Sequence, residues 1–183
     1  MRAIVSAVLV LAATCTAPAW ALDINGKTIG MSIDEVAQGY GKRWTCETAS
    51  DARAGDRICS KSTAVDEFPR MQNENFAGTH VAISYRFHDD RLVQIRVSGI
   101  SKGRYDGVLD TLKKAYGEPQ LETGSAQSKS GKTFDRNIAR WKDDGAVLDL
   151  STNTPKPPLV SLALYDAEYW KPRDAAAPAV DGG

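Results

Sequence analysis

Residues 80–119 read HVAISYRFHDDRLVQIRVSGISKGRYDGVLDTLKKAYGEP. In the first nine positions large apolar side chains occupy every second position, and after Asp89-Asp90 a second alternating run follows. Alternation with a period of two is typical of a strand with one buried face. The stretch therefore predicts a β-hairpin that turns near the two aspartates.

The register of this hairpin needs a local correction. Leu92 is out of step with Ile95 and Val97, and a slip of one residue would move the whole apolar set to the other face of the sheet. Either a three-residue loop or a β-bulge near Val93 would restore the alternation. We expect one of these two irregularities.

An amphipathic helix is predicted within residues 101–119. Its apolar positions recur at spacings of three and four, which places them on one face: Tyr105, Val108, Leu109, Leu112 and Tyr116. Gly117 can adopt the left-handed conformation that ends a helix, and Pro119 prevents continuation.

A second helix is predicted to begin after Ser32, which forms a capping-box pattern with Glu35, and to end at Gly41. Its apolar face consists of Ile33, Val36, Ala37 and Tyr40. Both helices end in Tyr-Gly and precede segments that read as strands, which is a weak internal repeat. We therefore expect an α+β fold with two helices packed on antiparallel sheet, and two repeated α-β-β-β units as an open option.

Further strands are expected on both sides of these units. Near the N-terminus, Asn25-Gly26 is a turn signal between two short, partly alternating segments. Toward the C-terminus, apolar runs predict three strands at residues 134–141, 147–150 and 159–165. The turn signal Asp143-Asp144-Gly145 separates the first two of these strands.

The first 21 residues are predicted to be a signal peptide. Arg2 supplies the positive charge, an apolar run follows, and Ala19-Trp20-Ala21 is a small-x-small cleavage site. Cys15 would allow a lipoprotein leader, but Thr14 precedes it where a small residue is expected. The apolar run is shorter than the roughly 20 residues that span a bilayer. We expect a periplasmic or secreted protein without a membrane span.

Removal of the leader leaves enough chain for one domain, predicted at residues 22–171. Residues 172–183 consist of Ala, Pro, Asp, Gly and single other residues, and we expect a disordered tail there. The chain carries 23 basic and 23 acidic residues. This balance argues against nucleic acid or an anionic membrane surface as the main partner.

Two cysteines follow the leader, Cys46 and Cys59. An even pair in an exported chain predicts a disulfide bond, and two free thiols are the alternative. A zinc site is not expected, since neither cysteine has a second cysteine or a histidine at ligand spacing.

Residues 49–79 read as the longest irregular region, tethered in its first half by the predicted disulfide. A loop of this length in a compact domain is functional or mobile. Arg53, Arg57 and Phe68 are the candidate binding residues, because arginine and aromatic side chains dominate binding hot spots. A loop that packs on the sheet for stability alone is the competing interpretation.

No constellation in the sequence predicts catalysis, a cofactor or a metal. Residues 126–133 loosely resemble a phosphate-binding loop, but the flanking segments lack its strand and helix. His80 and His88 lie at the two ends of one predicted strand, roughly 26 Å apart at about 3.3 Å per residue, and cannot act together. Asp89-Asp90 and Asp143-Asp144 read as turns, with weak calcium binding as a remote option.

The segment Ile29-Gly30-Met31-Ser32, with Glu35-Val36 and Tyr40-Gly41 after it, resembles the opening of small envelope domains of the SmpA/OmlA outer-membrane assembly lipoprotein type. The two-unit architecture is similar in outline to β-lactamase-inhibitor proteins. The chain lacks the proline after the final glycine and the lipidated cysteine of the former. The resemblance implies an envelope fold and carries no functional residue over.

These observations predict an exported bacterial envelope protein that acts as a protein-binding or structural module, of the inhibitor or assembly type, and not as an enzyme. The alternative is a periplasmic hydrolase that uses carboxylates near the long loop.

Overall fold

The computed structural model describes residues 21–48, 53–62, 73–127, 131, 133–152 and 159–171. Its centre is the predicted hairpin, formed by β6 (Thr79–His88) and β7 (Arg91–Ser101). Asp89 and Asp90 form a two-residue turn with φ of 47° and 64°, since His88 pairs with Arg91. The hairpin is confirmed.

The register correction is a bulge and not a longer loop. Phe87 pairs with Leu92 and Arg86 pairs with Gln94, so that Val93 is the extra residue of β7. Beyond this bulge, alternate residues of both strands face the same core. Of the two irregularities that the alternation allowed, the β-bulge at Val93 is confirmed.

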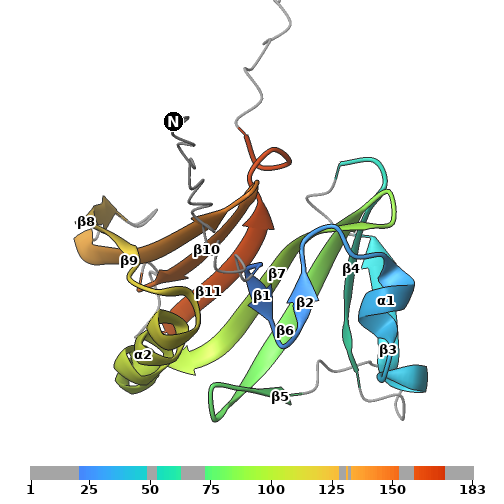
Figure 1. Ribbon diagram of the computed structural model, residues 1–183, viewed down its shortest axis with the longest axis horizontal. Helices are drawn as coiled ribbons and strands as arrows, with labels where there is room; N and C mark the ends of the chain where they lie inside the picture. Colours follow the sequence, from blue (N-terminus) through green and yellow to red (C-terminus); the bar gives the residue numbers. More distant parts are fainter. Residues whose placement is uncertain are drawn as a thin grey trace, which may run out of the picture.

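All nine described strands of the main sheet pair antiparallel (Figure 1). The strands from β3 to β7 form a first meander and those from β8 to β11 form a second, and the two meet where β7 pairs with β11. The strand order is β3-β4-β6-β7-β11-β10-β9-β8, with β5 on β6. Besides β6 and β7, the sheet contains β3 (Trp44–Thr48), β4 (Asp56–Lys61), β5 (Asn73–Phe76), β8 (Gln120–Gln127), β9 (Thr133–Asp143), β10 (Ala146–Ser151) and β11 (Leu159–Asp166).

The prediction of two helices packed on a sheet is wrong. The helix α2 (Tyr105–Tyr116) forms as expected and ends at Gly117. The first helix, α1 (Ile33–Ala37), has only five residues and is followed after a turn by the 3₁₀ helix η1 (Gly41–Arg43). Its capping box forms, but Gln38 is not helical and Gly39 has φ 90°, which ends the helix before Tyr40. The fold is a large sheet with one substantial helix.

The strand content was also underestimated. The region at residues 49–79 was interpreted as one long loop, but β4 and β5 lie within it and pair with β6. β8 was not predicted at all, because its sequence QLETGSAQ has little apolar alternation. The three C-terminal strands and their turn were predicted correctly. So was the Asn25-Gly26 turn, between β1 (Asp23–Ile24) and β2 (Lys27–Thr28).

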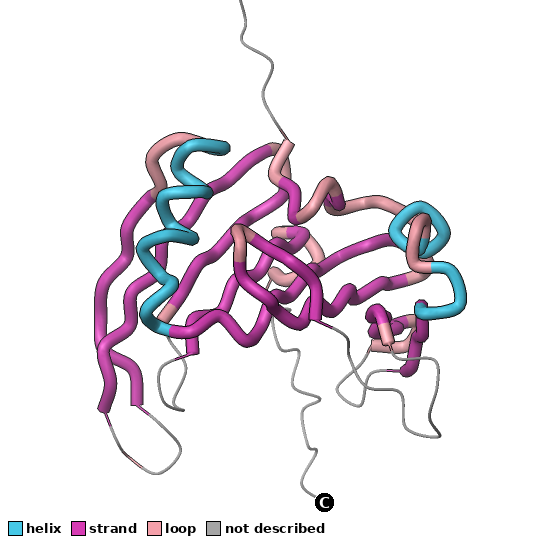
Figure 2. The backbone as a smooth tube through the Cα atoms, turned by 90° about the horizontal axis from the view of Figure 1, so that it is seen from below, coloured by secondary structure: helices cyan, strands magenta, loops and turns pink. Residues whose placement is uncertain are grey.

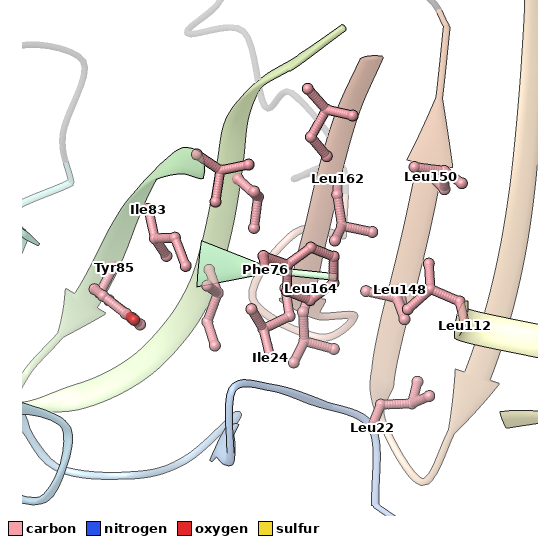
Figure 3. Close-up of a cluster of buried hydrophobic side chains, with 14 of the residues drawn as sticks. Leu22, Ile24, Phe76, Ile83, Tyr85, Leu112, Leu148, Leu150, Leu162 and Leu164 are labelled. Atoms are coloured by element: carbon pink, nitrogen blue, oxygen red, sulfur yellow. The ribbon is translucent and has the colours of Figure 1, made fainter. Parts of the chain in front are cut away.

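The hydrophobic core lies on one face of the sheet. Three elements outside the sheet and its short strand β5 contribute further buried side chains to the core: α2 with Val108 and Leu112, the β1–β2 hairpin and the residue before it with Ile24 and Leu22, α1 with Val36, and β5 with Phe76. Figure 3 shows Leu22, Ile24 and Phe76 gathered toward the leucines of β10 and β11. Figure 2 shows the helices and the short hairpin on the same side of the curved sheet.

No helix in the described ranges is long and apolar enough to span a membrane. Of the predicted leader, residues 1–21, only Ala21 is described; the predicted tail, residues 172–183, and Phe68 lie outside the described residues.

Candidate functional site

The face of the sheet opposite the core carries no described helix, and we call it the open face. On β6 the core-facing residues from Val81 to Phe87 are buried, whereas Ala82, Ser84 and Arg86 between them are half-buried. One row of paired residues crosses the open face from β4 to β9: Ser60, Ser84, Arg96, Ala163, Asp149 and Arg140. The candidate functional site is built on this face.

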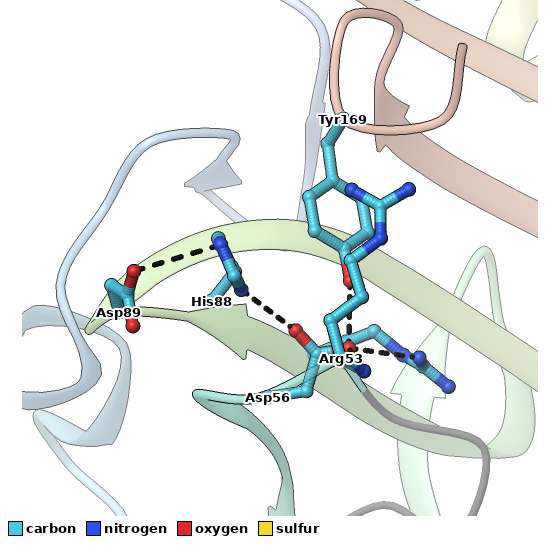
Figure 4. A network of polar contacts seen from close by, with 6 residues as sticks. Arg53, Asp56, His88, Asp89 and Tyr169 are labelled. Carbon is cyan, nitrogen blue, oxygen red and sulfur yellow. Dashed lines mark hydrogen bonds and ion pairs between the residues drawn. The ribbon is translucent and has the colours of Figure 1, made fainter. Parts of the chain in front are cut away.

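The first polar cluster of the open face is centred on Asp56, whose side chain is fully buried. Its carboxylate accepts hydrogen bonds from the Tyr169 hydroxyl at 2.6 Å, from His88 Nδ1 at 2.9 Å and from Arg86 at 3.2 Å (Figure 4). The backbone N–H of Arg53 donates a fourth, at 3.2 Å. Asp56 opposes His88 in the β4–β6 ladder, so the sheet itself brings the two side chains together.

The electrostatics of the cluster keep Asp56 charged. Burial alone would raise the pKa of its carboxyl group, but the hydrogen bonds from Tyr169, His88 and the backbone of Arg53, with the charge of Arg86, outweigh burial and lower the pKa. The Tyr169 hydroxyl shows the converse effect: burial, and then its bond to the carboxylate, raise its pKa. The tyrosine therefore acts as a hydrogen-bond donor.

A short turn after β11 folds over this cluster. The guanidinium of Arg53 lies 4.0 Å from the centre of the Tyr169 ring, and Arg86 lies 5.6 Å from the Trp170 ring. The Tyr169 ring also packs against His88, with centroids 5.3 Å apart. Trp170 remains 38% exposed, one of two large hydrophobic side chains exposed in the described part of the chain. The turn thus presents an aromatic side chain at the edge of the open face.

The second polar cluster lies on the other meander. Arg140 of β9 donates two hydrogen bonds to Asp149 of β10, at 2.7 and 2.9 Å, and also pairs with Glu122 of β8. Tyr165 of β11 donates to the same carboxylate at 3.0 Å. Burial, and then the charge of Asp149, raise the pKa of Tyr165 to about 12. Each half of the open face therefore holds an Asp–Arg–Tyr cluster in fixed geometry.

Arg96 of β7 stands between the two clusters. It is exposed, and its cross-strand neighbours are the small residues Ser84 and Ala163. Within the described ranges, no side chain forms an ion pair or a hydrogen bond with Arg96. Among the described residues, an exposed positive charge without an ion-pair partner therefore lies between small side chains on the open face.

The residues predicted to bind do not form one site. Arg53 lies in the Asp56 cluster, but Arg57 follows Asp56 in β4 and leaves the strand on the opposite face, across from Phe87. Phe68 lies outside the described residues. The Cys46–Cys59 disulfide is confirmed: the two residues pair directly between β3 and β4, with Cα atoms 4.0 Å apart.

Sequence reasoning singled out neither Asp56 nor Asp149, the residues at the centres of the two clusters. His88 was interpreted as a polar strand end, and Asp56 as part of a loop. Only a strand assignment for β4 could have brought them together, and the polar sequence DRICSK gives a weak signal for one. His80 lies at the other end of β6 and takes no part.

The clusters show little that would support nucleophilic catalysis. His88 binds Asp56 through Nδ1, and its Nε2 lies 3.6 Å from the exposed Asp89. No serine or cysteine side chain in the described part of the chain hydrogen-bonds to this histidine. A triad needs such a nucleophile. The described residues also contain no group of three or more His, Cys, Asp or Glu side chains placed to hold a metal ion.

The comparisons with known proteins add no relative to this picture. The chain matches no protein-family model, and no curated protein or solved structure is significantly similar to it. The resemblance to small envelope domains therefore stays a hypothesis.

Proposed function

We propose that this chain is an exported protein-binding module of the bacterial envelope, and that the partner binds on the open face of its sheet. The observation that carries the proposal is Arg96, an exposed arginine with small cross-strand neighbours and no ion-pair partner among the described residues, on a face that no described helix covers. An arginine in such a position matches a carboxylate, to which it donates two parallel hydrogen bonds. The partner is therefore a protein with an acidic side chain at the centre of its interface.

The two Asp–Arg–Tyr clusters support this proposal. In each cluster the aspartate holds an arginine and a tyrosine in one position through hydrogen bonds. These side chains therefore lose little conformational entropy when a partner binds. Trp170 and Arg53 add the residue types that are frequent in binding hot spots. The expected role of Arg53 is kept in this proposal, and Arg57, on the other face, is not part of it.

The alternative of a hydrolase is less well supported. The carboxylate near the long loop that it would need is Asp56, which is buried and already accepts four hydrogen bonds. A group in this state is poorly placed to attack a substrate or to accept a proton from water. The geometry favours recognition over catalysis.

The test uses the chain from Leu22, which includes every residue of the described core. Immobilised protein is exposed to an envelope extract, and captured proteins are quantified by mass spectrometry. We expect Arg96→Ala to reduce capture of a specific partner at least tenfold at an unchanged melting temperature. Arg104→Ala is the matched control, because Arg104 is an exposed arginine in the 3₁₀ helix η2 (Lys102–Arg104), outside the strands that form the open face.

Equal capture by wild type and Arg96→Ala, or equal losses in the two variants, would contradict the proposal. A hydrolytic activity that Asp56→Asn abolishes without unfolding the protein would favour the alternative.

A further inference from the structure

β8 is the terminal strand of the sheet on the side opposite to β3, and none of the described strands covers its outer edge. It pairs with β9 on one side, and no described strand pairs with it on the other. Its described side chains, residues 120–125, are all exposed, and Leu121 is 65% exposed. An open edge presents a row of unpaired backbone N–H and C=O groups that match another extended strand.

The sequence of β8 lacks the usual protection against edge pairing. Natural edge strands are kept apart by lysine, proline, bulges or short length. β8 has eight residues, QLETGSAQ, without lysine, arginine or proline, and its only charged residue is Glu122, whose carboxylate forms an ion pair with Arg140 of the neighbouring strand. The opposite edge, β3, has five residues and follows the basic pair Lys42-Arg43. The two edges of the sheet therefore differ in their capacity to pair.

We propose that β8 pairs antiparallel with β8 of a second copy of this chain, about a two-fold axis through Thr123. When this axis is perpendicular to the sheet, the numbers of any two opposed residues add to the same even sum. Each face of one copy therefore continues into the same face of the other. Centring on Thr123 places the two threonines opposite each other, which is a favourable cross-strand pair. It also places Glu122 opposite Gly124 of the second copy and Leu121 opposite Ser125.

Charge and side-chain contact favour this register over its two neighbours, and they favour β8 of a second copy over β3 as the partner. Centring on Glu122 would set two like charges opposite each other, which is destabilising, and centring on Gly124 would give no side-chain contact at the axis. Pairing β8 with β3 of another copy would bring Glu122 of β8 and Glu47 of β3 to the same junction between two edges. Such a contact is heterologous and produces a ring or an open chain of molecules, not a closed pair. The isologous pair closes after two copies and contains no opposed like charges. It also joins the two open faces into one surface.

Sedimentation of the chain from Leu22 over a wide concentration range tests the proposal. Edge pairing buries less than a standard interface of about 1,600 Å². We therefore expect the mass of two chains at high concentration and of one chain on dilution. Thr123→Lys, which sets two positive charges at the axis, should be monomeric throughout at an unchanged melting temperature. Thr123→Val, the matched control, should keep the dimer.

Cysteine cross-linking gives an independent readout. Oxidised Thr123→Cys should run as a covalent dimer, whereas Lys102→Cys, on the exposed η2 helix, should not. A wild type that is monomeric at every concentration, or equal cross-linking at the two positions, would overturn the proposal. The proposal would also be overturned if the wild type is a monomer that binds another protein and Thr123→Lys abolishes that binding, because a strand of that protein would then pair with the edge. The outcome of the Arg96→Ala capture experiment does not depend on whether the chain forms this dimer, so the two proposals can fail separately.

Discussion

Asp56 shows how a single buried carboxylate can hold distant segments together. Its partners come from the segment before β4, from β6 and from the turn after β11, and the last two of these are far from it in the chain. Each donor compensates for part of the desolvation that burial of the charge requires. Removal of the charge would leave the guanidinium of Arg86, whose side chain is only 11% exposed, beside a neutral group.

We expect Asp56→Asn to lower the free energy of unfolding by about 3 kcal/mol, since it breaks the buried ion pair with Arg86 and removes the charge that accepts the hydrogen bonds of Tyr169 and His88. Urea denaturation at pH 7 measures the change. The control is Asp89→Asn, at a side chain that is 77% exposed, and should change stability by less than about 0.5 kcal/mol. Equal effects of the two substitutions would contradict the role of Asp56.

The same residue predicts a dependence on pH. The pKa of Asp56 is lowered from its ordinary value of 3.8, so its contribution to stability is complete above that value and is lost as the pH falls through the folded-state pKa. The difference in unfolding free energy between wild type and Asp56→Asn should therefore be constant from pH 7 to about pH 5 and should shrink below about pH 4. A difference that persists unchanged to pH 2 would show that the carboxylate charge is not responsible.

At the scale of the element, α2 covers the core face of the second meander. Leu112 is 3% exposed and packs into the core, whereas Leu121, of the same size, is 65% exposed on β8. We expect Leu112→Ala to reduce the free energy of unfolding by about 2–5 kcal/mol because it removes buried apolar area and leaves a cavity. Leu121→Ala should stay within about 0.5 kcal/mol of wild type. Denaturant unfolding of both variants measures the contrast.

The disulfide acts on the β3–β4 hairpin, at one edge of the sheet. The bond closes a loop with a sequence separation of 13 residues, which corresponds to about 3 kcal/mol in the chain-entropy description. The double variant Cys46→Ala/Cys59→Ala should therefore melt about 6–12 °C lower than wild type, with the rest of the sheet intact by circular dichroism. Thiol titration of the denatured, unreduced wild type should find no free thiol from this pair. Two free thiols would contradict the bond in the cellular protein.

At the scale of the whole molecule, the core begins immediately after the predicted cleavage site. Leu22 is 4% exposed and Ile24 is fully buried, and both pack into the main cluster. Cleavage after Ala21 thus leaves the core complete, and intact-mass measurement of protein from the envelope should give Leu22 as the first residue. A chain that begins at Asn25 should unfold at lower temperature, because it lacks both side chains. A retained Met1, or an acylated Cys15, would contradict the predicted export.

Local patterns were sufficient for the elements whose signal lies in neighbouring residues. The alternation around Asp89-Asp90 predicted the central hairpin, and the phase error at Leu92 allowed the bulge that the structure contains. The stripe that ends at Gly117 predicted α2, and the Ser32–Glu35 capping box predicted where α1 begins. These features depend on periods and caps, which a chain displays without reference to its other parts.

Tertiary structure decided what these signals left undetermined. β4, β5 and β8 are polar and become strands because a neighbouring strand supplies their hydrogen bonds, so β4 and β5 were interpreted as loop and β8 was missed. α1 ends early because the backbone at Gln38 and Gly39 is not helical, and the spacing of apolar residues in the sequence does not indicate this. The Asp56 cluster joins residues up to 113 positions apart, and the exposure of Arg96 depends on which face the helices cover. Contacts of that range arise only from strand order and packing, because no local period encodes them.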